Sequence, residues 1–266
     1  MNNNAKILVV GVGGYIGKNF AEYAAFRKNS SFTIDMVSSR DNVWALKNFA
    51  GYDSVIFAVG IAHRKQTKKN RHLYFAVNRD LAVSVAEKAK SAGVRQFIYL
   101  SSMAVYGKKE GEISAHTIPN PAHNDYYGTS KFQAENALNK LADENFCVAV
   151  IRPPLVYGEN CPGKYGKLEK LAKYLPIVPD NKNKRSMIYI DNLSEFLCTV
   201  IESQKGGIFR PQDSKYTNTA LLIKHLRRQK GKKTVIFGAG LLLRLCMAVF
   251  PPIKTAFGNL YYCDTD

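Results

Sequence analysis

Short apolar runs alternate with stretches of helical periodicity over the first two-thirds of the chain. The runs are rich in β-branched residues, which is typical of strands buried on both faces of a parallel sheet. We predict strands at 5–10, 32–38, 53–60, 96–101 and 146–152, and helices at 15–26, 78–92 and 127–143. This alternation predicts an α/β fold with a doubly wound parallel sheet.

The pattern changes after about Cys161, where loops rich in glycine, proline and lysine and shorter helices are expected. We therefore predict an NAD(P)-binding, Rossmann-like sheet domain at 1–160 and a small C-terminal substrate-binding lobe at 161–266 that returns strands to the sheet. The apolar run from Val235 to Phe250 is shorter than the roughly 20 residues that span a membrane. It predicts a core or interfacial helix of the lobe, with contact at a membrane surface as the alternative.

The first predicted strand runs into a glycine-rich turn and then into a helix. Gly11, Gly14 and Gly17 stand in the turn, with Tyr15 and Ile16 at the start of the helix. Such a turn lets the backbone approach a diphosphate, which the helix N-terminus then faces. We predict that these five residues bind a nicotinamide dinucleotide in a Rossmann-like domain; an ordinary strand-to-helix turn is the alternative.

The carboxyl ends of the strands are the expected ligand-binding edge of such a sheet. Ala58 and Gly60 end the third predicted strand, Ser101 the fourth and Arg152 the fifth. We expect Ala58 and Gly60 to contact the cofactor. Asn78 stands at the start of the next predicted helix, where it is equally suited to capping that helix.

Tyr127 and Lys131 are four residues apart in a predicted helix and therefore share one face. A nearby ammonium favours a phenolate, so we expect Lys131 to lower the pKa of Tyr127 from about 10. Ser102 would give a second hydrogen bond to the same oxygen. These are the predicted catalytic residues for interconverting a carbonyl and an alcohol; an exposed helical pair is the alternative for Tyr127 and Lys131.

The end of the second predicted strand distinguishes NADP from NAD. An NAD site needs an acidic residue there, whereas Ser39 and Arg40 offer a hydroxyl and a guanidinium for a 2′-phosphate. Asp35 lies mid-strand in our assignment, and a shift of one or two residues would restore NAD. We therefore favour NADP.

The composition indicates a full hydrophobic core and anionic partners. The chain has 266 residues, of which 46% are hydrophobic, and a net charge of +17. This charge favours nucleotide ligands, nucleic acid or an anionic membrane surface, but no nucleic-acid-binding motif is present. We interpret the basic clusters at 65–71 and 227–233 as solvated faces.

The cysteines and histidines predict no metal site, because none has the spacing of metal ligands. The five cysteines are odd in number and widely separated, which indicates reduced thiols. The N-terminus shows no signal-peptide pattern. We therefore expect a cytoplasmic protein.

The chain resembles the extended short-chain dehydrogenase/reductase family, of the NAD-dependent epimerase/dehydratase type. The resemblance covers nearly the whole chain. It rests on the segments 11–17, 101–107, 127–131, 152–158 and 185–192, together with Asn78. It is greatest to the UDP-sugar 4-epimerases and 4-ketoreductases that serve surface-polysaccharide synthesis.

The resemblance implies a role for each matching residue. Tyr127 would be the acid/base, Lys131 its charge partner and a ribose contact, and Ser102 the donor to the carbonyl. Asn78 and Pro153 would border the cofactor.

On the substrate side, the resemblance places Arg185 beside the phosphates, with a surface arginine as the alternative. Met103 is expected at the substrate. Met103 and Ala104 stand where a 4,6-dehydratase needs acid and base groups, and neither can transfer a proton. Leu155 stands where many relatives place a substrate-binding asparagine. The relatives also continue beyond the segment similar to 256–262, so we expect a shortened C-terminus without their late diphosphate-binding arginine.

These features together predict NAD(P)-dependent oxidoreduction at C4 of a nucleotide-activated sugar. A 4-epimerase recycles NAD, whereas a 4-ketoreductase consumes NADPH, and Arg40 favours the reductase. The alternatives are a non-catalytic NADP-binding sensor or scaffold and a degenerate reductase. A nucleotide sugar is the expected partner, and a homodimer the expected assembly.

Overall fold

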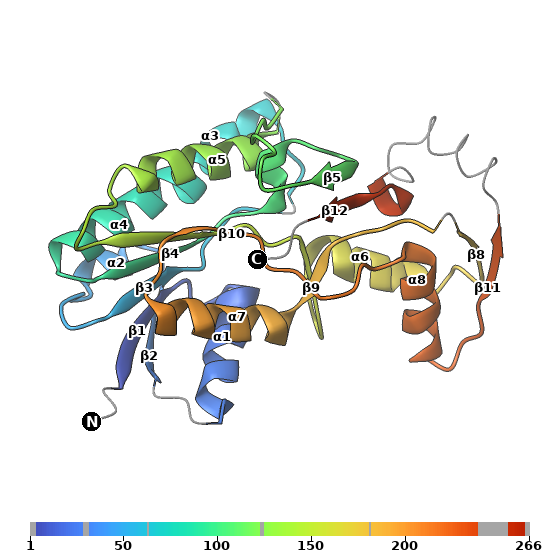
Figure 1. The fold of residues 1–266 in the computed structure, drawn as a ribbon, viewed down its shortest axis with the longest axis horizontal. Coiled ribbons are helices and arrows are strands. Elements are labelled where there is room, and N and C mark those ends of the chain that lie inside the picture. The colour runs from blue at the N-terminus through green and yellow to red at the C-terminus, as the bar shows by residue number, and fades with distance from the viewer. Residues whose placement is uncertain are drawn as a thin grey trace.

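The computed structural model describes residues 4–28, 32–62, 64–122, 125–180, 182–238 and 255–263. A six-stranded parallel sheet lies at its centre, in the order β10-β6-β4-β3-β1-β2 (Figure 1). The strands are β1 (Ala5–Val10), β2 (Phe32–Val37), β3 (Ser54–Phe57), β4 (Gln96–Leu100), β6 (Cys147–Ile151) and β10 (Gly207–Phe209). The strand order changes direction between β1 and β3, which is where sheets of this kind bind ligands.

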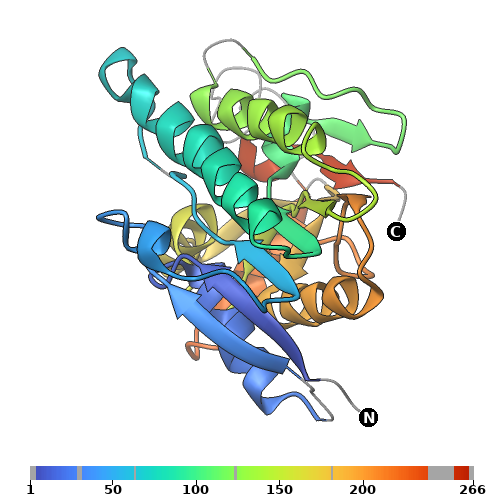
Figure 2. The same cartoon turned by 90° about the vertical axis from the view of Figure 1, so that its left-hand side faces the viewer.

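Helices cover both faces of the sheet, as Figures 1 and 2 show. On one face lie α1 (Tyr15–Phe26) and α7 (Ile190–Ser203). On the other lie α4 (Leu81–Ser91) and α5 (Tyr126–Asn139), with the short helices α2 (Val43–Leu46) and α3 (Arg71–Phe75) near them.

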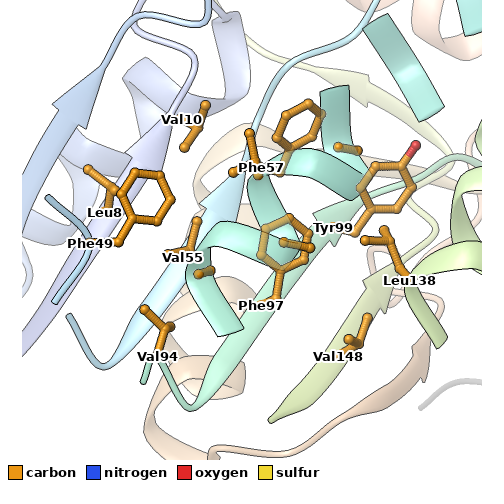
Figure 3. Close-up of a cluster of buried hydrophobic side chains, with 14 of the residues drawn as sticks. Leu8, Val10, Phe49, Val55, Phe57, Val94, Phe97, Tyr99, Leu138 and Val148 are labelled. Atoms are coloured by element: carbon orange, nitrogen blue, oxygen red, sulfur yellow. The ribbon is translucent and has the colours of Figure 1, made fainter. Parts of the chain in front are cut away.

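Side chains alternate along each strand and build a separate core on each face. In β1, Ile7 and Val9 pack with the α1–α7 layer, whereas Leu8 and Val10 pack with the α4–α5 layer. Figure 3 shows this second core, where aromatic side chains of β3 and β4 pack in one cluster with Leu138 of α5. Because both faces are buried, the strands read as continuous apolar runs.

The doubly wound parallel sheet predicted from the sequence is confirmed. The predicted elements shift by a few residues at their ends: β3 ends at Phe57 rather than at residue 60, and α5 at Asn139 rather than 143. The expectation of shorter helices after Cys161 holds for α6 and α8, with 10 residues each, but not for α7, which has 14 residues and packs on the sheet beside α1.

The C-terminal part also contains α6 (Gly163–Ala172), α8 (Thr219–Arg228) and three small parallel sheets. The strand pairs are β7 (Leu155–Tyr157) with β9 (Met187–Tyr189), β8 (Ile177–Asp180) with β11 (Val235–Gly238), and β12 (Leu260–Tyr262) with β5 (Gly111–Ile113). β10 joins the central sheet and α7 packs on one of its faces. The domain boundary at residue 160 stays a prediction.

The helix expected from Val235 to Phe250 is wrong at its start, where residues 235–238 form β11. The remainder of that run lies outside the described residues. Within the described ranges, no helix is long and apolar enough to cross a membrane.

Candidate functional site

The turn between β1 and α1 packs against the residue that follows β3. Gly11 has a φ of +124°, which favours glycine. A Cβ atom at Gly14 would lie 2.9 Å from the carbonyl oxygen of Ala58, and one at Gly17 would lie 3.0 Å from the Ala58 side chain. The structure therefore brings Ala58 and the three predicted glycines together, at the point where the strand order changes direction.

The first turn of α1 suits an anion. Gly14 caps the helix without a side-chain hydrogen bond, and the first turn holds no acidic residue. The Tyr15 hydroxyl donates to the Glu159 carbonyl at 3.0 Å, and the Ile16 side chain packs on the core. Both side chains thus face the protein, and the backbone N–H groups of a helix N-terminus attract negative charge. This cradle fits the diphosphate of a dinucleotide.

The end of β2 lies beside the glycine turn, because the Gly11 amide donates to the Val37 carbonyl at 2.9 Å. Ser39 and the exposed Arg40 follow directly. Asp35 pairs in register with Leu8, in the middle of the strand. Its carboxylate accepts the Tyr52 hydroxyl hydrogen bond, the main cause that lowers the Asp35 pKa. Asp35 is therefore engaged away from the strand end, and the exposed Arg40 is a charged group near that end.

Ser102 and Tyr127 come together as expected. Ser102 follows β4, and its oxygen accepts the Ala104 amide at 3.2 Å. Helix α5 approaches this loop closely, since a Cβ atom at Gly128 would lie 2.8 Å from the Ala104 carbonyl oxygen. Burial of the Tyr127 phenol raises its pKa, and the nearby Ser102 hydroxyl opposes this effect by favouring the phenolate.

Lys131 is buried one turn after Tyr127, with 3% of its surface exposed. Its Nζ donates to the carbonyl oxygens of Leu100 at 2.8 Å and Val59 at 3.4 Å, and lies 4.6 Å from the centre of the Tyr99 ring. Burial lowers the Lys131 pKa to about 7.

The expectation that Lys131 lowers the Tyr127 pKa is therefore wrong in this structure. An amine with a pKa of about 7 is already neutral at the pH where the buried tyrosine titrates. A neutral amine gives no charge stabilisation to a phenolate. The residues meet as predicted, but their electrostatics differ.

Asn78 joins the loop after β3 to α5. Its Oδ1 accepts the Ile61 amide at 2.7 Å, and its Nδ2 donates to Ser130 at 3.0 Å. It is buried within continuous helical backbone, a π-helical turn at Ala76–Asp80 that leads into α4, so it does not cap that helix. A Cβ atom at Gly60 would lie 3.2 Å from the Lys131 Nζ. Gly60 and Asn78 thus border the buried lysine.

Met103 and Pro153 form the wall next to Ser102. The Met103 amide donates to the Pro153 carbonyl at 2.9 Å. Pro153 is buried, and the Met103 side chain lies in an apolar cluster with Val105 and Tyr262. The structure therefore places the Met103 side chain in the protein interior behind the site, and a direct contact with substrate stays a prediction.

Arg185 lies in the C-terminal part, where backbone carbonyls hold its guanidinium. Nη1 donates to Thr255 at 2.8 Å and to Gly258 at 3.0 Å. Burial lowers the Arg185 pKa. This arginine is thus half-buried and positioned by the fold rather than free on the surface.

Two charged residues near these groups were not predicted. Lys164 lies on the first turn of α6; loss of solvation at its amine and then the Arg185 charge lower its pKa, and Asp125 opposes them. Lys164 is thus within electrostatic range of Arg185 and of Asp125, which caps α5. Glu135 is buried one turn after Lys131. Its spacing of four from Lys131 was the signal that could have identified it.

No cluster of three or more potential metal-ligating side chains occurs in the part of the chain that the structure describes. The groups brought together at the site are hydroxyl, amine and backbone amide groups. They can move a proton and bind an anion.

Comparison with known proteins gives a consistent picture. The family model of the NAD dependent epimerase/dehydratase family matches residues 7–210. The chain is 33% identical to a UDP-glucose 4-epimerase of Vibrio cholerae over 211 residues, which are 75% of this chain and 63% of that protein. It is 28% identical over 253 residues to the N-acetyl-alpha-D-glucosaminyl-diphospho-ditrans,octacis-undecaprenol 4-epimerase of Escherichia coli O157:H7, covering 88% of this chain and 74% of that protein. The chain thus spans less than two-thirds of the Vibrio relative.

Solved structures share the fold. A dTDP-4-dehydrorhamnose reductase from Clostridium acetobutylicum has a TM-score of 0.72 at 18% identity, over 88% of this chain and 83% of that one. The UDP-glucuronic acid 4-epimerase from Bacillus cereus in complex with NAD has a TM-score of 0.72 at 18% identity, over 98% and 88%. RMD from Pseudomonas aeruginosa with NADPH has a TM-score of 0.71 at 19% identity, over 89% and 85%.

Proposed function

Because the chain belongs to the NAD dependent epimerase/dehydratase family, we propose that it carries out oxidoreduction at C4 of a nucleotide-activated sugar. Its relatives include a UDP-glucose 4-epimerase, and the structures that share its fold include epimerases and reductases with NAD or NADPH. The observation that carries the proposal is that Ser102 lies near Tyr127 and favours its phenolate, with Lys131 buried one helical turn away.

The chain's own residues would handle the proton of this reaction. Tyr127 would protonate the C4 oxygen during reduction, or deprotonate it during oxidation. Ser102 would hold the same oxygen by a hydrogen bond. Lys131, when charged, would stabilise the Tyr127 phenolate. The bound dinucleotide supplies or accepts the hydride at the carbon.

We favour NADP as the cofactor and a 4-ketoreductase as the reaction. Two features support this choice: Arg40 is exposed just after β2, and Asp35 is held by Tyr52 in mid-strand. A guanidinium in this position suits a 2′-phosphate, whereas the Asp35 carboxylate is not placed for a ribose hydroxyl. A 4-epimerase with recycled NAD is the second reaction of the same site.

The proposal is tested by incubating the purified protein with NADPH and UDP-4-keto-hexoses, and separately with UDP-hexoses. NADPH consumption would identify a reductase, and interconversion of C4 epimers without net consumption would identify an epimerase. Tight NADP(H) binding without turnover of any nucleotide sugar would favour the sensor or scaffold. The homodimer expected from the sequence stays a prediction, which analytical ultracentrifugation would check.

A second candidate substrate is a sugar diphosphate on a lipid carrier, which requires access to a membrane surface. The outer face of the β8–β11 sheet supports this candidate. Ile177 and Val235 are register partners exposed at 60% and 61%, and Phe237 is exposed at 41%. Their neighbours Val178 and Ile236 turn inward onto the core beside α8. One face of this small sheet therefore presents apolar side chains to solvent.

Exposed lysines border this face. The Lys232 Nζ donates to the Lys173 carbonyl at 3.3 Å, and Lys233 leads into β11. Lysines at an anionic bilayer contribute about 1 kcal/mol each. The name of the Escherichia coli relative specifies a sugar that is linked through a diphosphate to the lipid carrier undecaprenol. The occupant we assign to the face is thus an anionic membrane surface.

Cosedimentation with vesicles of phosphatidylglycerol and phosphatidylcholine tests this second candidate. We expect binding at low salt that is lost when Lys173, Lys232 and Lys233 are replaced by glutamate. A control variant with the same substitutions at Lys65, Lys68 and Lys69 has the same net charge and should keep binding. Equal loss in both variants would show attraction by net charge alone, and no binding by the wild type would exclude the surface.

A further inference from the structure

A buried carboxylate that the proposed chemistry does not use lies one turn after Lys131. Tyr127, Lys131 and Glu135 are spaced by four residues in α5 and share one helix face. Glu135 is 1% exposed. A buried carboxylate is costly unless it is paired, so its partners indicate what it does.

The Glu135 carboxylate connects α5 to the ends of two central strands. It accepts hydrogen bonds from Arg152, from Nε at 3.1 Å and from Nη2 at 2.6 Å, and Arg152 directly follows β6. It also accepts the hydroxyl hydrogen bond of Ser101, which follows β4. Arg152 in turn donates to the Tyr106 hydroxyl at 2.9 Å. The Glu135 carboxylate and the Arg152 guanidinium therefore each have further hydrogen-bond partners besides one another.

These contacts hold the backbone that carries the proposed catalytic serine. Ser101 precedes Ser102, and Arg152 precedes Pro153, whose carbonyl accepts the Met103 amide. A carboxylate that ties Ser101 to α5 therefore sets the separation between Ser102 and Tyr127. Buried ion pairs often contribute little to stability compared with apolar residues of similar volume. Stability alone is thus a weak reason for placing this pair here.

Glu135 also acts on the charge of Lys131. The ionisable groups around the amine are Tyr127 and Glu135 on α5, Tyr99 on β4, and Arg152, which is paired with Glu135. Burial lowers the Lys131 pKa, and the Glu135 charge opposes this effect. Whether Lys131 is charged near neutral pH is therefore a balance between burial and one carboxylate.

We propose that Glu135 is a positioning residue of the reaction proposed above: it fixes the Ser102 strand end against α5, and its charge, one helical turn from Lys131, favours the protonated amine. This inference rests on the proposed function for its catalytic consequence. Its electrostatic part can be measured on the protein without substrate or cofactor.

The first test is an NMR titration of the lysine side chains in the cofactor-free wild type and in Glu135→Gln, with Lys131→Arg identifying the Lys131 signal. An opposite charge nearby shifts a pKa by about 1–3 units. We expect the Lys131 titration to move to lower pH by at least about one unit in Glu135→Gln. Glu87→Gln, an exposed carboxylate on α4, is the matched control and should leave it unchanged. An unmoved Lys131 titration in a folded Glu135→Gln protein would overturn the electrostatic role.

The second test separates charge from position in the active protein. Ser101→Ala keeps the carboxylate but removes its link to β4. We expect it to lower kcat with little change in KM and no shift of the alkaline limb of the pH–rate profile. Glu135→Gln should lower kcat and also move that limb to lower pH. Wild-type kcat in Ser101→Ala would overturn the positioning role.

Glu135→Gln leaves the Arg152 charge buried without its partner and could fail to fold. Ser101→Ala introduces no such charge, so the positioning role remains testable through kcat. The double variant Glu135→Gln with Arg152→Gln removes both charges and keeps the NMR titration available. An unmoved Lys131 titration in the double variant would count against the electrostatic role. If the wild type shows no turnover, the proposed function fails while the titration still decides this inference.

Discussion

The Nζ atom of Lys131 lies 2.8 Å from the backbone carbonyl oxygen of Leu100, the last residue of β4. This hydrogen bond places the amine at the carboxyl end of the central sheet, where Ser101 and Ser102 follow. The side chain reaches this carbonyl through the protein interior, which removes water from the amine. The same contact that positions Lys131 therefore makes its protonated form costly.

Replacing Lys131 with methionine is expected to remove a pH dependence of stability. Burial holds the folded pKa at about 7, below the unfolded value of about 10.4. Between these values the unfolded chain binds more protons, so the Lys131 contribution to the free energy of unfolding rises with pH. We expect urea unfolding below, within and above this pH window to show that the free energy of unfolding of the wild type rises with pH relative to that of Lys131→Met. If the free energies of unfolding of the two proteins change in parallel with pH, the lowered pKa of the buried Lys131 amine is contradicted.

Tyr127→Phe is expected to abolish most turnover while keeping cofactor affinity. The variant loses the proton donor, and general acid–base catalysis contributes about 10²–10⁴-fold. Stopped-flow rates on a confirmed substrate and calorimetry with NADPH would measure the two properties separately. Tyr126→Phe, one residue earlier in α5, is the matched control and should retain turnover. Unchanged turnover in Tyr127→Phe would refute its assignment as the acid/base.

Arg40→Ala is expected to weaken NADPH binding selectively. A charge-assisted hydrogen bond to the 2′-phosphate is worth about 1.5–3 kcal/mol, and NADH has no such phosphate. Isothermal titration calorimetry with both cofactors measures the difference. Asp35→Asn should leave the affinity for both cofactors nearly unchanged, because Asp35 is bonded to Tyr52. Equal losses of NADPH and NADH affinity in Arg40→Ala would remove its discriminating role.

Gly14→Ala is expected to destabilise the glycine turn and weaken cofactor binding. The new Cβ atom would lie 2.9 Å from the Ala58 carbonyl oxygen, so the backbone must shift. Overpacking of this kind costs about 1–3 kcal/mol. Gly13→Ala is the matched control: nothing lies within 4 Å of its Cβ position, and the effect should stay within about 0.5 kcal/mol. Equal unfolding free energies for the two variants, measured in urea, would show that the turn does not need its close approach to Ala58.

Local patterns were sufficient to predict five of the six central strands and the residues that meet at the candidate site. The apolar runs at β1, β3 and β6 reflect burial on both faces, which leaves a periodicity readable from sequence. Tyr127 and Lys131 share a face because they are four residues apart in a helix. Ser102 could be placed with them because parallel strands present their carboxyl ends at one edge.

The strands after residue 160 were less predictable. β11 has four residues, and Val235–Gly238 opens an apolar run that resembles a helix in sequence. Its identity as a strand comes from pairing with β8, which lies far away in the chain. Strand pairing is set by register with a distant partner, so a short run carries little of that information itself.

The chemistry of Lys131 was decided by tertiary structure alone. The sequence by itself determined that a lysine would lie beside Tyr127. It contained no sign that the carbonyl oxygens of Leu100 and Val59 would lie at the amine. The spacing of four placed Glu135 on the same helix face, but nothing in the sequence indicated that Arg152 would pair with it. A pKa depends on the solvation and charge of all surrounding atoms. Those atoms come from β3, β4, β6 and α5, so the charge of Lys131 exists as a property only after the chain has folded.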